Sequence, residues 1–232
     1  MKRSMAIQSR WQFCRAGITN VYQYENEVFG FHGGRLLLRG INGSGKSTAM
    51  NMLLPFLLTG KTRGIDAAGE QTGVLKSWML SGRDEKQPVG YLWLEFVRSV
   101  QTPQETADSE AEFEYISIGC GIKANRASDT VNTWWFVTSR RPSIDFELLE
   151  QQVPLSADAL RSVIQPDVVF AQDRRADYRQ EVGRRLYGGA SVDSFLDLIN
   201  TVRSPRVGDR VDVDLPEYLV AALPNLSEQA LL

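Results

Sequence analysis

The chain has 232 residues, of which 43% are hydrophobic and 23% charged, and its formal net charge is −2. This mixture is typical of a globular protein and excludes a disordered tail, a collagen-like fibre and a coiled coil along the whole length. The length fits one large domain or two small ones and is enough to bury a core. Because the chain is not basic overall, any contact with nucleic acid must come from a local patch.

Two cysteines, Cys14 and Cys120, and one histidine, His32, are too few for a disulfide framework or a zinc site. We therefore expect both cysteines to be small buried side chains, which fits a reducing, cytoplasmic compartment. The first residues lack the apolar run of a signal peptide, and no stretch approaches the roughly 18 apolar residues of a membrane span.

The first part of the chain predicts short strands, a helix and a long loop. Residues 12–39 are typical of strands with turns, and the apolar run 35–39, which ends at Gly40, predicts a buried strand. Residues 47–58 suit a helix, in which Pro55 predicts a kink or an early end. The polar, glycine-rich stretch 60–88 predicts a long loop, and such a loop in a compact domain is usually functional.

The second part predicts a meander followed by helices. Residues 90–100, 113–123 and 132–139 are rich in aromatic and β-branched residues and predict strands. We interpret residues 101–112 as a solvated hairpin tip.

Helices are predicted over residues 156–163 and 174–187, with a short strand over 168–170 between them and Gly188 as a stop signal. Residues 191–202 predict an amphipathic helix, and the end of the chain, from residue 215, predicts one more. The overall expectation is an α/β fold.

Residues 40–47 read GINGSGKS and match the pattern GxxxxGK[ST] in full. Its glycines let successive N–H groups point at phosphate oxygens, and the N-terminus of the following helix adds a partial positive charge. Lys46, the expected catalytic residue here, places an ammonium on the β- and γ-phosphates, and Ser47 offers its hydroxyl to Mg²⁺. The residues expected to hold ATP are Asn42, Gly43, Ser44, Gly45, Lys46, Ser47 and Thr48.

Hydrolysis also needs an acid at the end of an apolar strand. The run 168–173 ends in Asp173, but it is short and no second acid follows; the stretch 211–215 alternates and lies in a loop-like setting. Residues 80–83 read LSGR and are close to the LSGG signature of ABC-type ATPases, but they depart from it at Arg83. The phosphate-binding half of a site is present, and the hydrolytic half is missing.

The stretch GINGSGKST at 40–48 resembles the head of SMC-like ATPases. Residues 173–189, with a YR…LYGG pattern, and residues 195–205 resemble MukB-type bacterial condensins, closest to the large SMC-like subunit of Wadjet-type anti-plasmid systems. The resemblance implies the N-terminal half of a P-loop ABC-type head over residues 1–226, with a mixed sheet, an antiparallel meander and C-terminal helices. Residues 227–232 would then begin a coiled coil.

The resemblance also implies that the signature and Walker B motifs lie on a C-terminal half, and that two heads sandwich ATP and Mg²⁺. A glutamine, Gln172 or alternatively Gln165, would reach Mg²⁺ and the attacking water. Arg63, or secondly Lys61, would approach the nucleotide or DNA, and Arg15 could lie near the base. For each of these residues an ordinary structural or surface role is the alternative.

The implied partners are the C-terminal half, a second head of the same kind, kleisin-type accessory subunits and DNA contacted without sequence preference. The candidate DNA-binding residues form one cluster: Arg174, Arg175, Arg179, Arg184 and Arg185. The alternative is a solvated helix whose arginines pair with Asp173, Asp177 and Glu181. Two other functions stay open: a standalone P-loop NTPase that uses Asp173 as its acid, and a partner-docking module with a vestigial phosphate loop.

Overall fold

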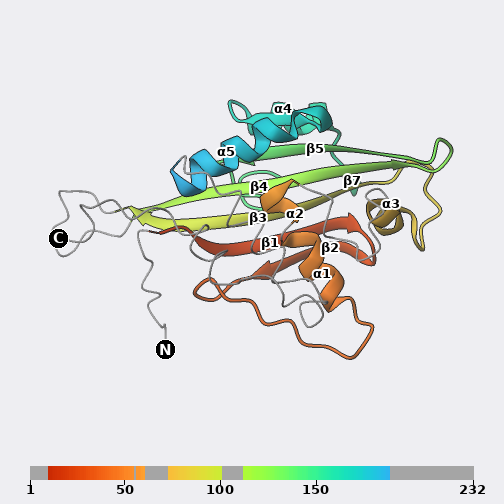
Figure 1. Cartoon of the computed structure of the whole chain (residues 1–232), viewed down its shortest axis with the longest axis horizontal. Helices are drawn as coiled ribbons and strands as arrows, with labels where there is room; N and C mark the ends of the chain where they lie inside the picture. The colour runs from red at the N-terminus through yellow and green to blue at the C-terminus, as the bar shows by residue number, and fades with distance from the viewer. Residues whose placement is uncertain (1–9, 55, 61–72, 101–111, 189–232) are drawn as a thin grey trace, which may run out of the picture.

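A six-stranded antiparallel sheet organises the computed structural model, which describes residues 10–54, 56–60, 73–100 and 112–188 (Figure 1). Its strand order is β2-β1-β3-β4-β5-β8. The strands are β1 (Gln12–Val21), β2 (Tyr24–Gly30), β3 (Val89–Val100), β4 (Glu112–Asn125), β5 (Thr130–Thr138) and β8 (Val168–Ala171). A separate hairpin pairs β6 (Leu149–Glu150) with β7 (Val153–Pro154).

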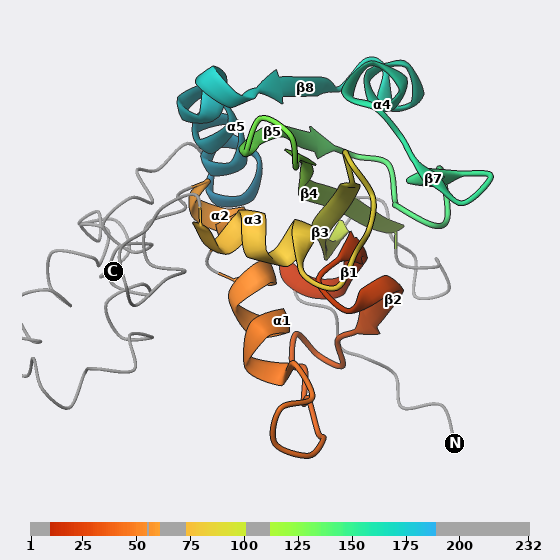
Figure 2. The ribbon, with the colours of Figure 1, turned by 90° about the vertical axis from the view of Figure 1, so that its right-hand side faces the viewer.

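Helices cover both faces of the sheet (Figure 2). They are α1 (Lys46–Leu53), α2 (Phe56–Thr59), α3 (Gly73–Leu80), α4 (Ala157–Ile164) and α5 (Arg175–Tyr187), with a 3₁₀ turn, η1 (Gln172–Arg174), before α5. Alternate strand residues point to opposite faces. Leu92 and Trp135 therefore join the core under α1, α2, α3 and α5, whereas Trp93 and Trp134 join a second core under α4.

Glycines on the α4 side make room for large aromatic rings. Tyr91, Gly121 and Trp134 lie side by side across β3, β4 and β5. A Cβ atom at Gly121 would lie 2.1 Å from Cε2 of Trp134, and one at Gly17 would lie 2.1 Å from Cε2 of Trp93. The rings thus occupy the space that a side chain at the neighbouring glycine would fill, an arrangement used to stabilise sheets that contain glycine.

The structure confirms the predicted meander and most of the predicted helices. The stretches 90–100, 113–123 and 132–139 form β3, β4 and β5, and 168–170 falls in β8. The Ser156 side chain caps α4 by accepting a hydrogen bond from the N–H of Ala159 at 3.2 Å. Helix α5 ends at Gly188, which has a left-handed φ of 67°. The helix predicted over 47–58 is divided into α1 and α2 around position 55, as its proline predicted.

Two predictions are wrong. Residues 36–40 form no strand; Leu37 is 80% exposed, because this segment has no strand beside it in the described part of the chain. The stretch predicted as a loop contains helix α3, which forms because Leu75 and Met79 are buried against the sheet.

Other predictions fall outside the described residues. They include the hairpin tip at 101–111, the helices from residue 191 onward and the coiled-coil start at 227–232. Both cysteines are free thiols; Cys120 is buried as expected, whereas Cys14 is half-buried. The coarse fold class is confirmed, since the chain is mixed α/β. The expectation of a mixed sheet differs from the structure, because every strand pair described in the six-stranded sheet is antiparallel.

Candidate phosphate-binding loop

The glycine-rich loop lies between β2 and helix α1, which begins at Lys46. Gly43 and Gly45 both have φ of 83°, in the left-handed region that favours glycine. A Cβ atom at Gly40 would lie 2.6 Å from the Ser44 hydroxyl oxygen, and the Ser44 N–H donates to the Ile41 carbonyl at 3.3 Å. Gly43 and Gly45 therefore allow the backbone conformation in which the loop curls back on itself.

The Lys46 ammonium lies inside this loop. Its Nζ donates to the carbonyl oxygens of Gly40 at 2.7 Å and Ile41 at 2.6 Å, and to the Ser44 hydroxyl at 3.3 Å. All three acceptors are neutral, so an anionic phosphate oxygen is a stronger partner for the ammonium than any of them. The arrangement suits a lysine that exchanges loop carbonyls for a bound anion.

The N-terminus of α1 offers further donors at the same place. Its first intrahelical hydrogen bond runs from the Ala49 N–H to the Gly45 carbonyl at 2.8 Å, so the N–H groups before Ala49 have no partner inside the helix. The first turn contains no acidic residue. Asn42, Ser44 and Ser47 are exposed, so the loop is accessible to a ligand from solvent.

Tyr24 on β2 supports the loop, a role that no sequence motif indicates. Its hydroxyl donates to the Gly45 carbonyl at 3.3 Å, and burial raises the pKa of this hydroxyl, which keeps it a donor. Arg83, from the LSGR stretch, binds the carbonyls of Tyr22 at 3.0 Å and Tyr24 at 3.4 Å, and also the Asn20 side chain. Arg83, the residue at which the LSGR stretch departs from the LSGG signature, thus holds the β1–β2 turn in place.

The structure does not bring Gln172 beside the phosphate loop. Its side-chain oxygen accepts a hydrogen bond from the Thr133 N–H on β5 at 3.0 Å, whereas the loop contacts Tyr24 on β2. Strands β2 and β5 are four strand spacings apart in the sheet, or about 19 Å. Figure 2 shows α1 and β8 at opposite sides of the sheet. The expected Mg²⁺ contact of Gln172 therefore has no support from this arrangement.

The other candidates for hydrolysis and nucleotide contact are also not gathered at the loop. Asp173 is exposed on η1 and, with Gln172, lines a hollow of about 550 Å³ that contains no residue of the phosphate loop. Gln165 is exposed at the end of α4, where its carbonyl accepts from Arg140 at 3.3 Å. Arg63 and Lys61 lie outside the described residues.

Arg15 has a structural partner. Its Nε donates to a carboxylate oxygen of Glu95 at 2.8 Å, and its guanidinium also binds the Pro142 carbonyl at 2.9 Å. Glu95 is fully buried on β3 and also accepts from Arg141. Arg15 is therefore engaged within the sheet, which bears out the structural alternative for this residue.

The arginines of α5 and η1 make contacts within the chain. Arg174 pairs with Asp177 at 2.5 Å, and Arg184 pairs with Glu181 at 2.6 Å. Arg175 donates to the Gln172 carbonyl at 3.1 Å, and Arg179 also has an interaction partner. Asp177 and Glu181, two of the three acids that the alternative of a solvated, ion-paired helix requires, thus pair with arginines.

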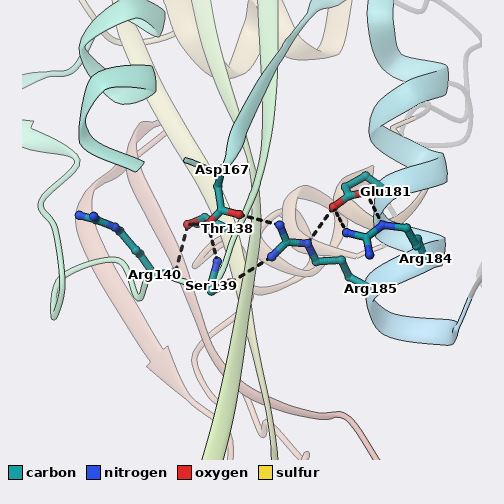
Figure 3. A network of polar contacts seen from close by, with 7 residues as sticks. All are labelled: Thr138, Ser139, Arg140, Asp167, Glu181, Arg184 and Arg185. Atoms are coloured by element: carbon teal, nitrogen blue, oxygen red, sulfur yellow. Dashed lines mark hydrogen bonds and ion pairs between the residues drawn. The ribbon is translucent and has the colours of Figure 1, made fainter. Parts of the chain in front are cut away.

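Arg185 anchors α5 to the sheet (Figure 3). Its guanidinium binds Glu181 at 2.8 Å, Asp167 at 2.6 Å and the Ser139 hydroxyl at 3.0 Å. Asp167, whose side chain is 12% exposed, also accepts from the Thr138 hydroxyl at 2.8 Å and the Ser139 N–H at 2.9 Å. Burial alone would raise the pKa of Asp167, but these hydrogen bonds hold it below its ordinary value.

No family model and no curated protein matches the chain. Within the described ranges, no three His, Cys, Asp or Glu side chains are grouped so that they could hold a metal ion. None of the helices that the structure describes is long and apolar enough to cross a membrane.

Proposed function

We propose that residues 40–48 bind the phosphates of ATP together with Mg²⁺. The observation that carries this proposal is the placement of Lys46, whose ammonium lies in a loop of carbonyl oxygens at the N-terminus of α1. Left-handed glycines at positions 43 and 45 give the loop the curvature that lets backbone N–H groups surround an anion. The helix N-terminus adds a partial positive charge there.

Each residue of the loop then has a defined role. Lys46 releases the carbonyls of Gly40 and Ile41 and neutralises the β- and γ-phosphates, while the backbone N–H groups of residues 43–48 bind phosphate oxygens. Mg²⁺ neutralises phosphate charge when it is bound, and we assign its contact with the chain to the hydroxyl of Ser47, which is exposed. Tyr24 keeps the loop in register through its bond to Gly45.

We further infer that the chain is the N-terminal half of an SMC-like head and that hydrolysis needs a C-terminal half. Two observations support this extension. Asp173, the best acid for a standalone enzyme, follows β8 at one edge of the sheet, whereas the loop follows β2 at the opposite edge. The apolar residues Leu37 and Ile41, just before and within the loop, are 80% and 83% exposed. A second half that supplies strands beside residues 36–41 would cover them.

On this proposal the complete protein acts on DNA without sequence preference, as a pair of heads with kleisin-type subunits. The arginines at 174 and 184 suit contact with phosphates because their side chains are 57% and 62% exposed despite their ion pairs. Exposed ion pairs contribute little stability, so a DNA phosphate can displace their acidic partners. Alanine at both positions should lower the salt dependence of DNA binding by the assembled protein.

Nucleotide binding is tested by calorimetric titration of the chain with MgATP. We expect saturable binding that Lys46→Ala weakens by about 100-fold or more, because a charged hydrogen bond to phosphate is lost. Lys76→Ala is the matched control, since the Lys76 ammonium on α3 pairs with the carboxylate of Asp129, which is not a loop residue. Equal losses in both variants would overturn binding at residues 40–48. No binding by the unaltered chain would leave only the vestigial-loop alternative.

Turnover distinguishes the half-head from the standalone enzyme. The chain alone should release negligible phosphate from ATP, and adding a polypeptide that carries signature and Walker B motifs should produce turnover. Ordinary enzymatic turnover by the chain alone, abolished by Asp173→Ala, would overturn the half-head proposal and establish the standalone NTPase.

A further inference from the structure

A groove of about 1090 Å³ lies at one end of the sheet, on the face that carries α5. In Figure 1 the C-terminal end of α5 lies over the end of the sheet where β3 finishes and β4 begins. Phe13, Phe96, Ile116 and Leu186 line the groove. The rings of Phe13 and Phe96 pack with centroids 4.8 Å apart. The floor of the groove is therefore apolar and largely aromatic.

Several large side chains around this floor are only partly covered. Phe113 is 39% exposed and Tyr187 is 37% exposed, and both line the groove. The Arg98 guanidinium lies 4.6 Å from the centre of the Trp11 ring. The charged residues that line the groove are Arg10, Arg98, Arg184 and Arg185, against a single acid, Glu114. Arg98 pairs with Glu114, and Arg184 and Arg185 pair with Glu181, so the rim is polar and ion-paired. An apolar trough with a polar rim is typical of a surface that another segment covers.

The chain itself continues from this groove. Gly188, which ends α5 with its N–H bonded to the Gly183 carbonyl, is one of the lining residues. Ser191 follows three residues later, within about 10 Å of extended chain. The helix that the sequence predicts over residues 191–202 would be about 18 Å long. The segment thus starts close enough to lie along the groove.

We propose that residues 191–202 occupy this groove as an amphipathic helix. Their apolar residues Val192, Phe195, Leu196 and Ile199 share one face at helical spacing and match the aromatic floor. The segment carries two carboxylates, Asp193 and Asp197, and no basic residue. Its charge is opposite to the net charge of the rim, where four arginines stand against Glu114 and the two further acids that pair with them, Glu181 and Asp167. This inference does not depend on nucleotide binding.

Photocrosslinking in the full chain tests the proposal. Benzoylphenylalanine in place of Phe113 should crosslink, on irradiation, to residues 191–202 of the same chain, with a yield that does not change on dilution. The same probe in place of Ile144, which is 56% exposed and does not line the groove, should give no such crosslink. Crosslinks between two copies, crosslinks to residues 1–9 instead, or no crosslink at all would overturn it.

A pair of variants tests whether the apolar face makes the contact. Leu196→Asp should lower the crosslink yield by roughly tenfold, because burying a carboxylate on the groove floor is unfavourable. Ser194→Asp, on the opposite face of the predicted helix, should leave it unchanged. A yield that Leu196→Asp does not lower would overturn the proposal. Benzoylphenylalanine in place of Tyr187, at the end of α5, should give the same crosslink to residues 191–202. The result therefore does not depend on correct folding of the variant at Phe113 alone.

Discussion

The buried carboxylate of Glu95 holds two arginines against the sheet. Glu95 is fully buried, and it accepts from Arg15 at 2.8 Å and from Arg141 at 3.2 and 3.3 Å. Burial alone would raise the pKa of Glu95, but the hydrogen bonds from both arginines lower it below its ordinary value. The carboxylate is therefore charged in the folded chain at neutral pH.

Glu95→Gln keeps the shape of the side chain and removes its charge. The arginine side chains at 15 and 141 are only 17% and 23% exposed, so they lose their counter-ion in a poorly hydrated place. Removing one partner of a buried ion pair costs roughly 3–5 kcal/mol. Because both arginines keep some access to water, we expect the lower end, about 3 kcal/mol.

The matched control is Glu114→Gln, which removes the charge from an exposed ion pair between β3 and β4. Arg98 on β3 and Glu114 on β4 face each other across the two strands and form an ion pair, but their side chains are 40% and 47% exposed. Exposed pairs contribute about 0–1 kcal/mol. Glu114→Gln should therefore cost at least about 2 kcal/mol less than Glu95→Gln.

Urea unfolding followed by circular dichroism, with linear extrapolation, measures both costs. The folded pKa of Glu95 is depressed, so its stabilisation is present above the unfolded pKa and is lost as the pH falls through the folded value. The difference in the free energy of unfolding between Glu95→Gln and the unaltered chain should therefore become smaller as the pH is lowered. Equal costs for the Glu95 and Glu114 variants, or a difference that acid does not make smaller, would refute the reasoning.

Three further predictions follow from the same structure. Gly121→Ala should lower the free energy of unfolding by about 1–3 kcal/mol because its Cβ meets an indole ring, whereas Gly30→Ala, with open space around it, should cost nothing in the same urea titration. Leu37→Ser should change that free energy by less than about 0.5 kcal/mol, since the side chain is already exposed. Asp167→Asn should speed amide exchange in α5 at neutral pH. Because the folded pKa of Asp167 is depressed, acid should abolish the difference from the unaltered chain.

The elements that the sequence predicted correctly are those specified by neighbouring residues. The strands of the meander are rich in aromatic and β-branched residues over their whole length, and Ser156 and Gly188 mark helix ends that local hydrogen bonds complete. The curled backbone of residues 40–46 is specified in the same local way, whereas its binding of phosphate stays a prediction. Its curvature depends on glycines and one lysine within eight residues, so the motif alone predicts how the loop folds.

The features that the sequence missed depend on contacts between distant residues. The sequence around α3 is polar and rich in glycine and predicts a loop. The helix forms because Trp78 and Met79 are buried in the core beside the sheet. Tyr24 reaches Gly45 across 21 residues, and Arg83 reaches Tyr24 across 59, so no spacing rule points to either contact. The sequence favours Gln172 because it follows a short strand, but that strand, β8, forms the edge of the sheet away from the loop.

The segment before the phosphate loop shows why a correct pattern can give a wrong element. Burying Leu37 and Ile41 would stabilise the protein by roughly 1.5–3 kcal/mol each, yet both remain exposed because no described strand lies beside them. On the proposed function, a C-terminal half supplies that strand. Gly40, between the two residues, is also a carbonyl partner of Lys46. A partner that fixes the backbone of residues 36–41 therefore also fixes the loop and raises its affinity for nucleotide. Because such coupling is reciprocal, bound nucleotide must raise the affinity of the chain for the partner by the same factor.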